Sequence, residues 1–159
     1  MNEREVHLTV NGEPRRASVE PRRMLSELLR DDLELTGTHV ACEHGVCGAC
    51  TVLLDGQPVR SCLVLGVQAD GRAVTTIEGV AGDELHPVQQ GFYECHSFQC
   101  GFCTPGFVMS TLALLADDPA PEERAIREGV SGNLCRCTGY ESIVRGVQRA
   151  AELLAEGGS

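Results

Sequence analysis

The chain has 159 residues, with 23 acidic residues, 13 arginines and no lysine, so its net charge is −10. The lack of lysine excludes a Walker-A phosphate site, a pyridoxal phosphate Schiff base and a lysine general base. Neither half is basic, which argues against nucleic acid as a partner. The sequence has no run of about 18 apolar residues and no apolar leader, so we expect a cytoplasmic protein with no transmembrane segment. In such a reducing compartment, nine cysteines favour metal ligands over disulfides.

The first half of the chain predicts a small sheet crossed by one helix. The alternation of Val6, Leu8 and Val10 with polar residues predicts a strand over 6–10. Short apolar runs bounded by turn residues predict further strands over 17–19, 51–54, 59–64 and 74–77. Asn11-Gly12 supplies a hairpin turn, and Pro21 precedes a helix whose leucines fall on one face. A glycine-rich loop over 37–48 separates this helix from the later strands. We therefore predict an α+β domain over residues 1–79.

From residue 80 onward the hydrophobic pattern is helical. Helices are expected over 88–92, 105–116, 122–129 and 140–155. Pro105 fits the first turn of the second of these helices, and the last carries a clean amphipathic stripe. A second, all-helical domain is therefore predicted over residues 80–157.

The first cysteine group has the spacing C-x4-C-x2-C, with a fourth cysteine on the next predicted hairpin. Its members are Cys42, Cys47, Cys50 and Cys62. Plant-type ferredoxins use this arrangement to hold a 2Fe–2S cluster. Gly45 and Gly48 would let the loop wrap closely around the cluster, with backbone N–H groups turned toward the sulfurs. A zinc site usually pairs two short knuckles, and a Rieske site needs a C-x2-H pair that this chain lacks, so the pattern favours the ferredoxin type.

The second cysteine group consists of a C-x2-C pair and a C-x-C pair, each ahead of a predicted helix. These residues are Cys100, Cys103, Cys135 and Cys137. Free N–H groups and the positive dipole end of a helix suit an anionic metal–thiolate group. On spacing alone, zinc remains an alternative, although the C-x-C pair is unusual for it. Cys95 fits neither group, and we expect it to pack as a small buried hydrophobic residue on a helix.

Four stretches carry a resemblance to a known family. They are residues 35–39 (LTGTH), 42–51 (CEHGVCGACT), 99–106 (QCGFCTPG) and 132–140 (GNLCRCTGY). Together they resemble the small iron–sulfur subunit of the molybdenum hydroxylases, the xanthine oxidase family that includes aerobic carbon monoxide dehydrogenase. The likeness covers the chain from about Val6 to Leu154, and the last two stretches are highly specific.

The resemblance implies a β-grasp 2Fe–2S ferredoxin-like domain followed by a four-helix bundle that binds a second 2Fe–2S cluster. It implies a large partner subunit with molybdopterin and molybdenum, and a medium subunit with FAD, in a dimer of heterotrimers. Electrons would pass from molybdenum through the helical-domain cluster and the ferredoxin-type cluster to FAD. Gln99 would bond the pterin, and Cys137 would ligate iron beside the pterin edge. Substrate choice would belong to the large subunit.

Two other functions are consistent with parts of the sequence. A freestanding ferredoxin would need only the first 80 residues, so the helical half argues against it. A structural zinc adaptor would use the same cysteines but would be colourless. The chain itself lacks the G-x-G-x-x-G and G-x-S-x-G motifs and any histidine metal triad, so we expect no substrate chemistry on it. His44 is expected to face solvent, and Arg136 either balances cluster charge or reaches a partner.

Overall fold

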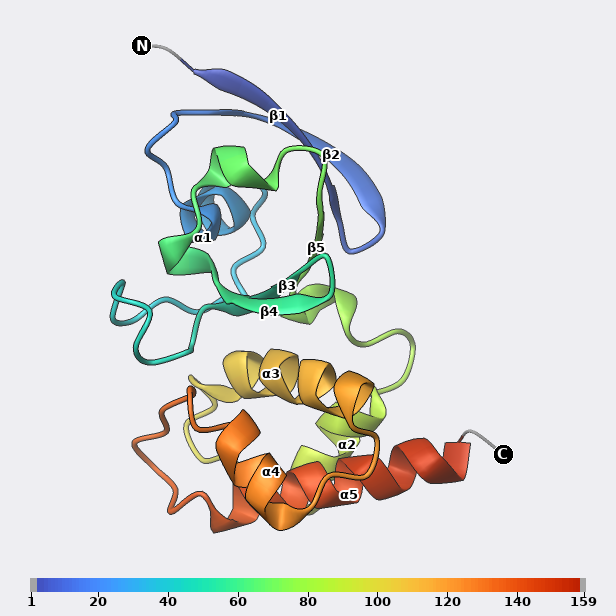
Figure 1. Cartoon of the computed structure of the whole chain (residues 1–159). Helices are drawn as coiled ribbons and strands as arrows, with labels where there is room; N and C mark the ends of the chain where they lie inside the picture. Colours follow the sequence, from blue (N-terminus) through green and yellow to red (C-terminus); the bar gives the residue numbers. More distant parts are fainter. Residues whose placement is uncertain (1–2, 158–159) are drawn as a thin grey trace.

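In the computed structural model, which describes residues 3–157, a sheet domain stacks on a helical domain (Figure 1). The strands are β1 (Arg4–Val10), β2 (Glu13–Val19), β3 (Thr51–Leu54), β4 (Gln57–Arg60) and β5 (Ala73–Thr75). They lie in the order β2-β1-β5-β3-β4, and only β1 and β5 are parallel among the paired strands. The predicted α+β architecture of the first half is confirmed.

Alternation along β1 creates the inner face of this sheet. Val6, Leu8 and Val10 are buried while the residues between them are exposed, as period-two side-chain direction requires. The short helix α1 (Leu25–Glu27) continues into a π-helical turn over Leu28–Asp32. Its buried leucines join the same hydrophobic core. This packing anchors the segment that leads into the first cysteine loop.

The predicted strand over 59–64 is wrong beyond Arg60. Residues Ser61–Leu63 instead form a 3-10 turn. Ser61 explains the change, because both its backbone N–H (3.2 Å) and its hydroxyl (2.7 Å) donate to the carbonyl oxygen of Cys50. The turn therefore brings the residue after Ser61 back toward the first cysteine loop.

The helical domain contains four helices within the described residues. They are α2 (Pro87–Glu94), α3 (Thr104–Asp117), α4 (Glu123–Gly129) and α5 (Glu141–Gly157). These helices enclose a second hydrophobic core, distinct from that of the sheet. Helix α2 packs closely on α5 because Gly91 has no side chain: a Cβ there would lie 2.7 Å from the backbone of Gly146 and Ala150.

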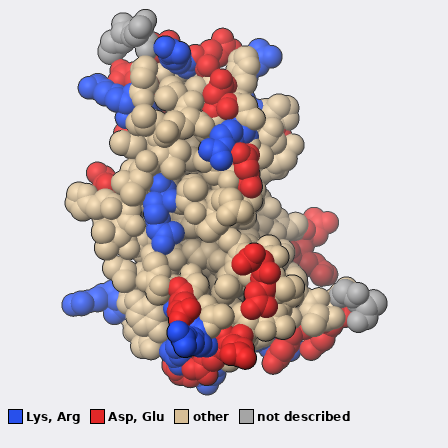
Figure 2. All heavy atoms as spheres, viewed as in Figure 1, with Lys and Arg blue, Asp and Glu red and all other residues tan. Residues whose placement is uncertain are grey.

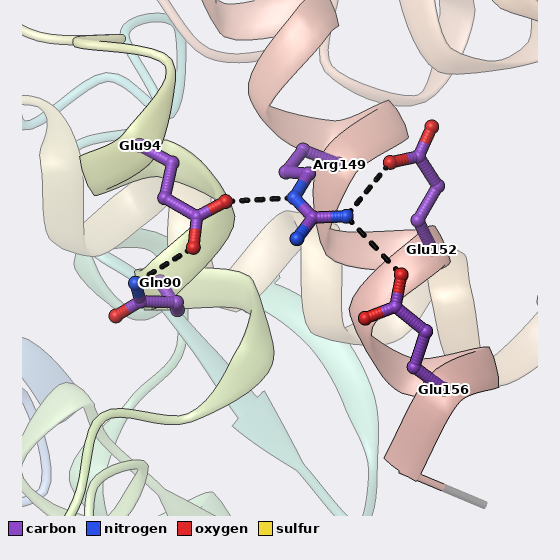
Figure 3. Close-up of polar contacts among 5 residues, drawn as sticks. All are labelled: Gln90, Glu94, Arg149, Glu152 and Glu156. Carbon is purple, nitrogen blue, oxygen red and sulfur yellow. Dashed lines mark hydrogen bonds and ion pairs between the residues drawn. The ribbon is translucent and has the colours of Figure 1, made fainter.

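A polar network reinforces the contact between α2 and α5 at the surface. The Arg149 guanidinium donates to the Glu94 carboxylate at 2.7 Å and also contacts Glu152 and Glu156 (Figure 3). Gln90 donates to the other oxygen of Glu94 at 2.8 Å. In the view of Figure 2, arginines and acidic side chains gather at the top and bottom of the molecule, further acidic side chains lie along its right side, and an arginine patch lies left of its centre.

The last helix, predicted to start at about Tyr140, begins one residue later, because Tyr140 has a different backbone conformation. Tyr140 has a positive φ of 68°, and α5 begins only at Glu141. The Tyr140 ring faces inward, 6.3 Å from that of Phe107.

Across residues 3–157, none of the helices combines the length and apolar character required to cross a bilayer.

Candidate metal centres

The first cysteine loop follows α1 and is shaped by two glycines with left-handed backbone angles. Gly45 has φ of 73° and Gly48 has φ of 75°, conformations that glycine adopts without the penalty of a Cβ atom. The four sulfurs come from the loop and from the turn after β4. Cys50 and Cys62 are buried, whereas Cys42 and Cys47 are partly exposed.

Backbone amides in this loop point at a sulfur. The N–H groups of His44 and Cys47 each donate to Cys42 Sγ at 3.4 Å. These hydrogen bonds lower the pKa of Cys42 to about 6, because they favour the thiolate over the thiol. The loop thus stabilises negative charge on sulfur, as a metal–thiolate group requires.

The remaining two sulfurs of the first group form a buried pair. Cys62 contacts Cys50, and burial, followed by this contact, raises the pKa of Cys62 to about 11. A thiolate here needs a compensating cation, since an isolated buried charge is strongly disfavoured. A bound metal would supply that compensation.

The second group also consists of two sulfur pairs. Cys137 Sγ lies 3.4 Å from Cys100 Sγ, and both residues are exposed. Cys103, the residue directly before α3, contacts Cys135, and burial raises the pKa of Cys103 to about 12. The Thr138 hydroxyl donates to Cys135 Sγ at 3.2 Å.

Two further side chains hold the C-x-C segment. The Tyr140 hydroxyl accepts a hydrogen bond from the backbone N–H of Cys135 at 2.8 Å. Gln99, an exposed residue, donates through Nε2 to the carbonyl oxygen of Cys137 at 3.0 Å. These roles of Tyr140 and Thr138 were not predicted, although the two residues follow the C-x-C pair by three positions and one, close enough to reach its backbone and a sulfur.

The way in which the eight sulfurs pair indicates which kind of metal group they can hold. No three or more His, Cys, Asp or Glu side chains among residues 3–157 are placed to hold one metal ion. Each quartet instead divides into two close pairs: 42 with 47, 50 with 62, 100 with 137 and 103 with 135. Two irons, each with two thiolates, need this division. The donor set therefore fits a 2Fe–2S cluster in each group.

Three other residues considered in the sequence belong to none of the four sulfur pairs. His44 and Arg136 have exposed side chains. Cys95 is partly buried at the C-terminal end of α2, and none of the four sulfur pairs includes it.

The two groups meet where the domains touch. A cavity of about 130 Å³ is lined by Cys47 from the first group and by Cys100, Cys103 and Cys135 from the second. Beside it, the backbone N–H of Leu134 donates to the carbonyl oxygen of Cys47 at 2.8 Å. The two sulfur groups are therefore neighbours across the domain boundary.

Comparison with protein families assigns both halves of the chain. Residues 8–75 match the 2Fe-2S iron-sulfur cluster binding domain, and residues 76–148 match the [2Fe-2S] binding domain. Both domains therefore belong to iron–sulfur families.

Known proteins resemble the chain along nearly its whole length. The 6-hydroxypseudooxynicotine dehydrogenase complex subunit beta of Paenarthrobacter nicotinovorans is 55% identical over 146 residues, covering 91% of each chain. Caffeine dehydrogenase subunit gamma of Pseudomonas sp. (strain CBB1) is 51% identical over 152 residues, covering 93% of this chain and 91% of the relative. A chain of quinoline 2-oxidoreductase from Pseudomonas putida 86 superposes with a TM-score of 0.93 at 47% identity, covering 98% of both chains.

Proposed function

Because this chain belongs to the iron–sulfur subunits of the molybdenum hydroxylase family, we propose that it relays electrons through two 2Fe–2S clusters between partner subunits of an oxidoreductase. The observation that carries this proposal is the division of eight cysteines into four close sulfur pairs, with the two quartets meeting at one cavity. Each cluster, when bound, accepts and releases single electrons. The chain's own residues hold, orient and insulate the clusters.

The proposed ligands follow the pairs. Cys42, Cys47, Cys50 and Cys62 hold the first cluster, and Cys100, Cys103, Cys135 and Cys137 hold the second. In each cluster one pair is more buried than the other. One iron of each cluster would therefore face the protein interior and the other would lie nearer the surface.

We propose that the domains divide at residues 79 and 80, into a β-grasp ferredoxin-like fold and a four-helix bundle. The two separate hydrophobic cores support this division. Ile77 and Val80 pack against the helical core, so the connection itself contributes to the second domain.

Each sulfur group lies near its own exposed surface, and the two surfaces support docking of two different redox partners. Gln99 and Cys137 lie at the surface of the second group, where we propose that the molybdopterin subunit docks and that Gln99 bonds the pterin. Val46 and Leu63 flank the first group and are 64% and 59% exposed. Large exposed apolar side chains of this kind are typical of a protein interface, and we assign this one to the FAD subunit of a dimer of heterotrimers.

The relatives also suggest a substrate class. Nicotine derivatives, caffeine and quinoline, which the names of three relatives contain, are all nitrogen heterocycles. We propose that the complete enzyme oxidises such a compound in its large subunit. Assays of the purified complex with quinoline, nicotinate and aliphatic aldehydes would test this choice, and a preference for the aldehydes would contradict it.

The decisive experiment measures iron, acid-labile sulfide and zinc per chain, together with the EPR spectrum of the dithionite-reduced complex. Four irons, four sulfides and two distinguishable signals are expected. Zinc in place of the second cluster would support an adaptor, and a chain that purifies alone with two irons would support a diffusing carrier. Either result would overturn the proposal.

Single cysteine substitutions test which cysteines hold which cluster. We expect Cys62→Ser to remove the first EPR signal and Cys103→Ser to remove the second, since each loses a buried thiolate. Cys95→Ser is the matched control because it alters a cysteine outside the four pairs, and it should retain both signals and the full iron content.

A further inference from the structure

Three consecutive residues join the two sulfur groups. Gly132 accepts a hydrogen bond at its carbonyl oxygen from Arg60, at 2.6 Å. Asn133 donates through Nδ2 to the carbonyl oxygen of Gly48 at 3.0 Å. Leu134 donates its backbone N–H to the carbonyl oxygen of Cys47 at 2.8 Å. Residues 132–134, here called the bridging segment, thus each make one hydrogen bond to the cysteine loop or the hairpin of the first domain.

Asn133 fixes the position of this segment. Its side chain is 2% exposed and uses both ends, since Oδ1 accepts from the Ser110 hydroxyl of α3 at 2.8 Å while Nδ2 reaches the first domain. Its backbone N–H donates to the carbonyl oxygen of Val130 at 3.0 Å. A buried amide with all of these partners holds one orientation, because releasing any of them leaves a polar group unsatisfied.

The segment also provides a short bonded connection between sulfurs of the two groups. It runs from Cys135 Sγ through one peptide unit to the Leu134 N–H, across the 2.8 Å hydrogen bond, and through Cys47 to its own Sγ. Electron tunnelling decays less steeply through bonds and short hydrogen bonds than through empty space. A cluster held by Cys135 and one held by Cys47 would therefore be coupled along this connection.

We propose that the bridging segment is the electronic connection between the two clusters, with the Leu134 N–H···O=C Cys47 hydrogen bond as its key step and Asn133 as its positioning residue. The inference rests on the proposed function. Residues 132–134 would carry one electron from a cluster held by the helical domain, which would be oxidised, to a cluster held by the sheet domain, which would be reduced, with no proton or atom transferred.

The test compares Asn133→Ala with Asn11→Ala in the complete enzyme complex. Asn11 is a matched control because its side chain also makes two hydrogen bonds, both to Thr76 (2.9 and 2.8 Å) within the sheet domain. Its left-handed φ of 51° adds a strain cost for alanine, so the control variant is also destabilised.

Three readouts distinguish an electronic connection from a loss of stability alone. In Asn133→Ala, hydrogen exchange at the Leu134 amide should accelerate about thirtyfold, which corresponds to two hydrogen bonds of about 1 kcal/mol each. The magnetic coupling between the two reduced clusters in the EPR spectrum should weaken, and electron transfer between them after flash reduction should slow. Asn11→Ala should match the wild type in all three measurements.

The outcomes separate this inference from the function on which it rests. If Asn133→Ala retains four irons and also the wild-type exchange, coupling and transfer rate, the bridging segment is not the connection. If the wild-type complex lacks four irons, the proposed function fails, whereas the exchange rate at Leu134 still decides whether Asn133 positions the segment.

Discussion

The backbone of Gly106, in the first turn of α3, lies directly against the carbonyl oxygen of Gly48 in the first cysteine loop. A Cβ atom at Gly106 would overlap that oxygen, and a Cβ at Gly48 would lie 2.5 Å from the carbonyl oxygen of Gly132. Glycines beside three of the cysteine segments therefore let the two domains meet backbone against backbone. This contact sets how closely the sulfur groups approach.

Gly106→Ala should destabilise the protein although alanine is the better helix former. The helical preference favours alanine by roughly 0.5–1 kcal/mol, but overpacking against a fixed backbone costs about 1–3 kcal/mol. We expect a net loss in the free energy of unfolding, measured by urea denaturation. Gly82→Ala is the matched control because a Cβ there meets no atom within 4 Å, and an equal loss in both variants would contradict the explanation.

Arg60→Lys should weaken the domain contact even though it keeps the charge. Arg60 donates from Nη1 to the Thr51 hydroxyl and from Nη2 to the Gly132 carbonyl oxygen, both at 2.6 Å. A lysine ammonium lacks the planar fork that reaches both acceptors. We expect a loss of about 1 kcal/mol in urea denaturation. Arg15→Lys, in an exposed pair with Glu13, should lose much less, and similar losses in the two variants would contradict this role of the two Arg60 hydrogen bonds.

The sequence predicted the element types well where hydrophobic period and turn residues decide them. The alternation of Val6, Leu8 and Val10 predicted β1, and the spacing of the cysteines predicted two metal-binding groups. The interdomain bonds of Arg60 and Asn133 were not predictable, because their partners lie 72 and 85 residues away and no local pattern marks them.

Gly106 shows why a local rule can mislead. Judged by helix propensity alone, a glycine at this position destabilises α3. The reason for it is the backbone of Gly48, which leaves no room for a Cβ atom. Tyr140 fits the apolar stripe of the last helix, yet tertiary contacts with Phe107 and Cys135 hold it outside that helix in a left-handed conformation. Long-range packing decided both positions.

Glu94→Gln should lower the thermal unfolding temperature at neutral pH, with an effect that fades in acid. Hydrogen bonds from Arg149, then from Gln90, hold the pKa of Glu94 below its ordinary value of 4.5. The stabilisation is therefore complete above pH 4.5 and is lost as the pH falls through the lowered pKa. Thermal unfolding of the cluster-free protein between pH 7 and pH 3 would measure this.

Salt and a control variant check the electrostatic origin of that effect. The pair is partly exposed, so high salt should narrow the difference between Glu94→Gln and the wild type. Glu84→Gln alters an exposed carboxylate in the connection before α2, and it should behave like the wild type. A difference that persists unchanged from pH 7 to pH 3 would show that Glu94 acts through packing.

Tyr140→Phe should loosen the second cluster selectively. The variant keeps the ring beside Phe107 but removes the hydroxyl that accepts the Cys135 N–H at 2.8 Å. An unpaired, partly buried N–H costs about 1–3 kcal/mol, and this cost falls on the segment that carries Cys135 and Cys137. We expect a chelator to remove half of the iron faster than in the wild type, with the second EPR signal disappearing first. Tyr93→Phe, at a ring that is 70% exposed, should not change the rate, and equal iron loss from both clusters in Tyr140→Phe would contradict the local role of Tyr140.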